Sequence, residues 1–186
     1  MVYNSNHTQN KVRNCHRKDI MNFFLLDVYK DNPFRVSKDT NGGYGTANDY
    51  GKGLVSAFLS RIKKHTTDFP PISLPYIAAC LRAQGHNVTY GRNVFPKHNI
   101  DCVILYSSIV EYSTEINWGR RLKEAGFFVG FVGPFASVMS DNYLKVSDFV
   151  VKGDETFYFL GPVNKDELKG VVSPSITDHN LNDLPF

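Results

Sequence analysis

The sequence predicts an α/β fold with a doubly wound, parallel sheet of five strands. Short apolar runs alternate five times with segments of helical apolar spacing, an order typical of βαβ units joined by right-handed crossovers. The run at residues 101–108 (DCVILYSS) is apolar through its middle, as in a central strand buried on both faces. A chain of 186 residues has the length of one domain of common size.

Composition and charge exclude several classes of function. The chain is 42% hydrophobic and 21% charged, which is ordinary for a globular protein. Its net charge is only +3, and its one basic cluster, residues 13–18, argues weakly for nucleic-acid binding. No apolar run reaches the roughly 18 residues that a membrane span needs, and residues 1–20 lack the apolar core of a signal peptide. We therefore expect a cytoplasmic protein that binds neither nucleic acid nor membrane.

The three cysteines do not have the spacing of a metal site. Cys80 and Cys102 fall within apolar patterns, which predicts buried free thiols in a reducing compartment. Cys15 has His7 and His16 nearby, but no fourth ligand follows at a useful spacing. We therefore expect no metal ligands from the protein itself.

The first quarter of the chain contains one strand and the start of a long connection. Residues 1–19 are polar and aperiodic, which predicts a flexible extension. Residues 20–27 (IMNFFLLD) form the first predicted strand, which ends at Asp27. Residues 28–70 form an unusually long connection, and long loops of this kind are commonly functional.

The long connection carries a glycine-rich stretch and a helix. Residues 40–46 (TNGGYGT) contain three glycines that permit positive φ and close approach to a ligand, but they match neither a Walker loop nor a dinucleotide-binding motif. A ligand-contacting loop and a mobile surface loop both remain open at this point. Residues 53–64 have apolar positions at helical spacing, which predicts a helix.

The remaining elements are predicted from the positions of proline and glycine and from the spacing of apolar residues. Residues 70–85 begin with proline and end with glycine, the expected boundaries of a helix. From residue 160 the pattern ends, apart from an apolar pair at 171–172, so that 20–162 is the expected domain and 163–186 a tail or linker. The other predicted elements are strands at 86–90, 101–108, 127–132 and 148–153, and helices at 111–125, at 136–146 and from 154.

Small residues follow the two inner strands. Ser107 and Ser108 end the central strand, and Gly133 and Pro134 interrupt the next one. In open α/β sheets, ligands bind beyond the carboxyl ends of the strands, and glycine there lets the backbone approach a bound group. Each serine taken alone is more often a helix cap than a ligand contact.

Five segments, in order, resemble the N-terminal cobalamin-binding domain of B12-dependent radical S-adenosylmethionine (SAM) enzymes. Residues 70–88 (PPISLPYIAACLRAQGHNV) are similar to that domain's PP-x-(G/S)-L-x-Y-(L/I)-A-A-x-L segment, which continues to G-H-x-V. The other four are 101–108, 131–137 (FVGPFAS), 147–155 (SDFVVKGDE) and 181–186 (LNDLPF), of which the last resembles the linker before the catalytic barrel.

The resemblance implies a flavodoxin-like, Rossmann-like domain that holds cobalamin against the carboxyl edge of its sheet. It would serve a methyltransferase-type radical SAM barrel, which is the implied partner. The expected cofactor-binding residues are Asp27, Gly43, Tyr44, Ser107, Ser108, Ile109, Gly133, Pro134, Ala136, Ser137 and Gly153.

The sequence departs from that family in two places. Residues 27–32 (DVYKDN) contain no histidine that could ligate cobalt, and the chain has no Cys-x-x-x-Cys-x-x-Cys motif for an iron–sulfur cluster. We therefore expect no catalysis by this chain alone. Two alternatives remain: an interaction module of the same fold that has lost cobalamin, and a carrier of flavin or another nucleotide.

Overall fold

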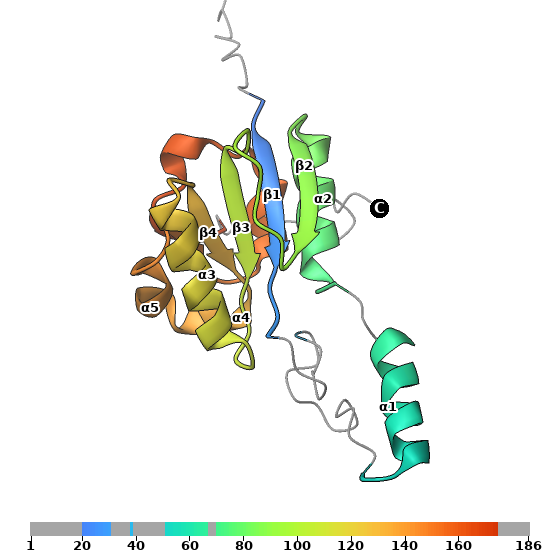
Figure 1. Ribbon diagram of the computed structural model, residues 1–186. Coiled ribbons are helices and arrows are strands. Elements are labelled where there is room, and N and C mark those ends of the chain that lie inside the picture. Colours follow the sequence, from blue (N-terminus) through green and yellow to red (C-terminus); the bar gives the residue numbers. More distant parts are fainter. Residues whose placement is uncertain (1–19, 31–37, 39–50, 67–69, 175–186) are drawn as a thin grey trace, which may run out of the picture.

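The structure, a computed structural model, describes residues 20–30, 38, 51–66 and 70–174 of the chain (Figure 1). Its strands are β1 (Asn22–Asp27), β2 (Asn87–Arg92), β3 (Cys102–Tyr106), β4 (Val129–Val132), β5 (Phe149–Val151) and β6 (Gly170–Val172). Its helices are α1 (Leu54–Thr66), α2 (Ser73–Ala83), α3 (Tyr112–Glu124), α4 (Pro134–Val138), α5 (Ser140–Leu144), α6 (Glu155–Leu160) and the 3₁₀ turn η1 (Lys165–Glu167).

Within the described residues, the strands form one sheet in the order β2-β1-β3-β4-β5-β6, and every neighbouring pair is parallel. The predicted α/β fold with a parallel sheet is confirmed. The first five strands follow the order found in flavodoxin-like sheets, and β6 extends that order at one edge.

The predicted count of five strands is wrong, because β6 adds a sixth. This strand contains the apolar pair at 171–172 and lies within the residues expected to be a tail, where Val171 pairs with Val150 of β5. Three residues are too few to show a periodicity in the sequence. The single helix expected at 136–146 is also divided, since α4 and α5 meet at Met139, whose φ of −109° and ψ of 35° are not helical.

Helices cover both faces of the sheet, and each face has its own apolar core. Alternate residues of a strand point to opposite faces, so Phe23 and Leu25 of β1 pack in the core beneath α2 and α6. Phe24 and Leu26 pack in the other core, beneath α3, α4 and α5. The sheet is therefore wound on both sides, and β3 is buried along its whole length.

The connection from β2 to β3 is unlike the other strand connections, because it contains no helix. Residues 93–101 cross in front of β1 as coil (Figure 1). Phe95 anchors this coil, with its ring centroid 6.1 Å from that of Trp118 and 5.8 Å from that of Phe127. In the described parts of the chain, no helix has both the length and the apolar character needed to cross a bilayer.

Candidate functional site

The carboxyl ends of β1, β3 and β4 lie side by side at one edge of the sheet, called here the carboxyl edge. Leu26 pairs with Leu105, and Tyr106 pairs with Val132, so that the residues that follow these strands converge. Asp27, Ser107 and Gly133 are thereby brought together from distant parts of the chain. Gly43 and Tyr44, which were also expected at the cofactor, lie outside the described residues.

Ser107 joins the end of β3 to the start of α4. Its backbone N–H donates to the carbonyl oxygen of Val132 at 2.7 Å, and its Oγ accepts the N–H of Ala136 at 2.7 Å. The first N–H groups of a helix have no partner within the helix, so this hydroxyl satisfies one of them. Ser107 and Ala136 are both fully buried. The serine therefore holds the start of α4 against the ends of β3 and β4 from inside the protein.

Gly133 is required by the protein's own backbone. Its φ is +104°, which residues with a side chain rarely adopt, and a Cβ there would lie 2.9 Å from the carbonyl oxygen of Ser107. The positive φ and the closeness of Ser107 are enough to explain a glycine here, so the glycine by itself does not indicate that a ligand approaches the backbone. Any side chain at residue 133 disturbs the turn even when no ligand is present.

A buried carboxylate, Glu115, lies directly beneath the loop that follows β3. Its Oε1 accepts the N–H and the hydroxyl of Ser108 at 2.8 and 3.0 Å, and its Oε2 accepts the hydroxyl of Tyr143 at 2.7 Å. Burial raises the pKa of the Glu115 carboxyl, whereas Lys38 and these hydrogen bonds oppose the rise. Burial, together with the nearby Glu115 carboxylate, also raises the pKa of the Tyr143 hydroxyl.

Lys38 connects the long connection to the carboxyl edge. Its ammonium group lies 3.1 Å from Glu115 Oε1 and 3.5 Å from Asp27 Oδ1, and it donates to the carbonyl oxygen of Tyr106 at 2.9 Å. The side chains of all three charged residues are completely buried. Buried charges are costly unless they are paired and hydrogen-bonded, and here one cation serves two carboxylates.

Asp27 has a second cationic partner. Arg92 Nε lies 3.2 Å from Asp27 Oδ2, and the hydroxyl of Tyr90 donates to the same oxygen at 3.3 Å. Burial raises the pKa of the Asp27 carboxyl, and Lys38 and Arg92 oppose the rise. We refer to Asp27, Lys38, Arg92 and Glu115 as the buried charge cluster. Because it holds two acids and two bases, its charges balance.

Sequence reasoning did not identify Lys38, Arg92 or Glu115. Lys38 and Arg92 belong to no motif, and Lys38 lies 77 positions from Glu115, while Arg92 lies 65 positions from Asp27. Glu115 had a detectable signal, because it shares one face of α3 with the buried residues Gly119 and Leu122, at spacings of four and seven. An acid on the buried face of a helix predicts a specific partner.

Ser137 links the turn after β4 to the turn after β5. Its hydroxyl donates to the carbonyl oxygen of Gly133 at 3.1 Å and accepts the N–H of Gly153 at 3.1 Å. Gly153 has a φ of +98°, and the next residue, Asp154, caps α6 by accepting the N–H of Thr156 at 2.9 Å. These contacts hold the two turns in one arrangement.

Exposed apolar side chains lie on the segments that follow β3 and β4. Ile109 is 61% exposed and Val138 is 78% exposed. Val110, Pro134 and Met139 are also exposed. We call these five residues the apolar residues of the carboxyl edge. Their exposure is notable because Ser107 and Ser108, directly before Ile109, are almost completely buried.

Potential metal ligands are not gathered anywhere in the described ranges, where no three His, Cys, Asp or Glu side chains could hold an ion together. Cys80 and Cys102 are free and buried, as predicted, and burial raises the pKa of both thiols. No family model, curated protein or solved structure that was compared with this chain matches it.

Proposed function

We propose that this chain is a cobalamin-binding domain of the flavodoxin-like type, which holds a corrin against the carboxyl edge for a separate radical SAM barrel. The observation that carries the proposal is the exposure of Ile109, Val110 and Val138 where open α/β sheets bind their ligands. Cobalamin is proposed as the ligand because five segments, in order, resemble a cobalamin-binding domain.

The face of a corrin ring is large, flat and mostly apolar, so a protein that contacts this face needs a broad apolar surface. The apolar residues of the carboxyl edge fit that requirement and would contact one face of the ring. The hydroxyls of Ser107 and Ser108 do not fit a direct role, because each is engaged inside the protein. Both serines would instead hold the contacting loops in place.

Asp27 also has an indirect role in this proposal. It is fully buried and paired with Lys38 and Arg92, so it supports the edge and does not contact the corrin. The buried charge cluster ties β1, β3, α3 and Lys38 together, which keeps the edge preformed for a rigid ligand. When bound, cobalamin supplies methyl-transfer or redox chemistry, and this chain positions it.

The proposal is tested by incubating the protein with hydroxocobalamin, removing free cofactor by gel filtration and recording the visible spectrum. We expect corrin to elute with the protein in a stoichiometric amount. A colourless protein with an intact circular dichroism spectrum would refute corrin binding by this chain alone.

A second candidate, an interaction module without cofactor, is favoured by α1. The apolar residues of this helix share one stripe and are all exposed, and its sequence has three basic residues and no acidic ones. The stripe consists of Leu54, Val55, Phe58, Leu59 and Ile62, with exposed fractions between 44% and 94%. A stripe of this kind usually contacts another protein surface. Colourless protein whose sedimentation coefficient falls on Phe58→Asp would support this candidate.

A further inference from the structure

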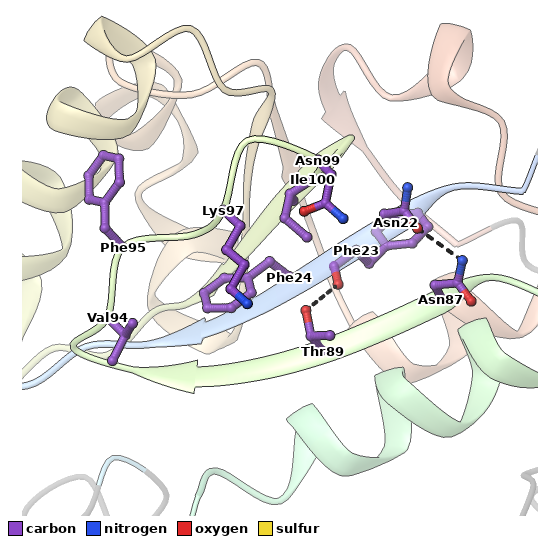
Figure 2. A pocket seen from close by; sticks show the side chains of 10 residues that line it. All are labelled: Asn22, Phe23, Phe24, Asn87, Thr89, Val94, Phe95, Lys97, Asn99 and Ile100. Atoms are coloured by element: carbon purple, nitrogen blue, oxygen red, sulfur yellow. Dashed lines mark hydrogen bonds between the residues drawn. The ribbon is translucent and has the colours of Figure 1, made fainter.

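A cavity of about 300 Å³ lies on the sheet face that the β2–β3 coil crosses (Figure 2). The other strand connections place helices on the sheet, whereas residues 93–101 cover β1 and β2 only as coil. The cavity is therefore a direct result of the missing helix. Its size is at the lower end of the range for small-molecule sites, roughly 300–1,000 Å³.

The floor of the cavity is the side chain of Phe24. The tip of its ring occupies the space directly above Gly91 of the neighbouring strand β2, where any Cβ would meet the ring. Phe24 is only 8% exposed, and its ring is thereby fixed between Gly91 and the cavity. A glycine at this position explains how an aromatic ring can lie across the edge strand.

The walls are apolar and come from the coil. Val94 is 56% exposed and Phe95 is 39% exposed, and Ile100 continues the same surface. The contacts of Phe95 with Trp118 and Phe127 fix its position, so that this aromatic wall is preformed. Such a lining suits a planar, apolar ligand.

Five of the ten residues that line the cavity are polar, but only one of them is charged. Lys97 extends over the cavity beside Phe24 (Figure 2) and is the single charged residue of the lining. Asn22, Asn87 and Asn99 lie at the opposite end, where Asn87 Nδ2 donates to Asn22 Oδ1 at 2.9 Å. Asn99 also lines the cavity and is exposed.

We propose that this cavity binds a small planar aromatic anion. Phe24, Phe95 and Val94 would enclose the ring, and Lys97 would pair with the acid group. No acidic side chain lines the cavity, so the charge of Lys97 is not neutralised there. The site is independent of the carboxyl edge, because it lies on the face of the sheet and reaches the amino end of β1 at Asn22.

The proposal is tested with two dyes that differ in charge, the anion 1-anilinonaphthalene-8-sulfonate and its neutral analogue N-phenyl-1-naphthylamine. Each is titrated into ¹⁵N-labelled protein, and the backbone amide shifts are followed by NMR. We expect saturable shifts at Thr89, Val94 and Ile100. Shifts confined to α1 or to Ile109 and Val110, or no saturable shifts, would overturn the proposal.

Two variants separate the parts of the site. Gly91→Ala pushes the Phe24 ring into the cavity and should weaken both dyes, whereas Gly161→Ala is the matched control, because its Cβ meets nothing closer than 3.6 Å. Lys97→Ala should weaken the anionic dye by about twofold to fivefold, the range for a partly exposed ion pair, and leave the neutral dye unchanged. Lys169→Ala, at another exposed lysine, is its control.

If Gly91→Ala does not fold, Val94→Asp replaces it, since Val94 is already more than half exposed. The added carboxylate should then repel the anionic dye more than the neutral one. Equal effects of Lys97→Ala on the two dyes, or none on either, would overturn the assignment of Lys97 as the partner of the anion.

Discussion

Lys38 lies between two buried carboxylates, and its replacement by methionine removes the cation but keeps most of the side-chain volume. The substitution deletes the contacts to Glu115 Oε1 at 3.1 Å, to Asp27 Oδ1 at 3.5 Å and to the Tyr106 carbonyl oxygen at 2.9 Å. Removing one partner of a buried ion pair costs about 3–5 kcal/mol, because the remaining charge stays buried without compensation. We expect Lys38→Met to lower the unfolding free energy by about that amount at pH 8.

The loss should depend on pH in a defined direction. Burial raises the pKa of both Asp27 and Glu115, and Lys38 opposes that rise. A carboxyl whose folded-state pKa exceeds its unfolded value stabilises the fold fully only below the unfolded pKa, about 4, and this contribution is lost as the pH rises through the folded-state pKa. Without Lys38 both folded-state values rise further. The destabilisation should therefore be small near pH 4 and grow toward pH 8.

Urea unfolding of wild type and variant at pH 4.5 and pH 8, followed by circular dichroism, measures both quantities. Lys169→Met, at an exposed lysine, is the control and should change the unfolding free energy by less than about 0.5 kcal/mol. In the double variant Lys38→Met with Glu115→Gln, loss of one buried charge should restore part of the stability at pH 8. A Lys38→Met loss below about 1 kcal/mol at pH 8, or an equal loss at both pH values, would refute this account of the buried charge cluster.

Three further predictions concern the fold. Tyr143→Phe leaves Glu115 Oε2 without its hydroxyl donor and should lower the unfolding free energy by about 1–3 kcal/mol; an unchanged urea midpoint would contradict the role of that hydrogen bond. Gly130→Ala places a Cβ against the Phe149 ring in the middle of the sheet, and this overpacking should cost about 1–3 kcal/mol, whereas Gly161→Ala should cost less than half of that. Because burial raises the pKa of Cys80 and Cys102, iodoacetamide at pH 8 should alkylate them only after unfolding, which peptide mass spectrometry can detect; rapid labelling of either native thiol would disprove its burial.

The elements of the fold were mostly predictable because their signals are local. The apolar run at 101–108 predicted β3, and the proline and glycine around residues 70–85 predicted α2. Both signals lie within a single segment: the first is the set of apolar side chains that a strand buries, and the second is the pair of residue types with which a helix begins and ends. β6 escaped prediction because its three residues gain their role only by pairing with β5. The break at Met139 also escaped, since no proline or glycine marks it.

The candidate site was predictable in its location but not in its chemistry. The rule that ligands bind beyond strand ends identified Ser107 and Gly133, and the structure brings both to the carboxyl edge. The buried charge cluster joins Asp27 to Arg92, which is 65 positions away, and Glu115 to Lys38, which is 77 positions away in the unpatterned long connection. One sequence carries no signal for such pairs. The sequence also predicted α1 as an amphipathic helix without indicating that its apolar stripe is exposed.

The central claim, that the carboxyl edge binds a corrin, is tested most directly by equilibrium dialysis with hydroxocobalamin. The informative variant is Ile109→Asp with Val138→Asp, which places two charges on side chains that are already exposed. The matched control is Val171→Asp on β6, at a residue that is 45% exposed. We expect one corrin per chain for wild type and control, and at least a tenfold weaker affinity for the double variant. Equal binding by the double variant, or no binding by the folded wild type, would contradict the claim.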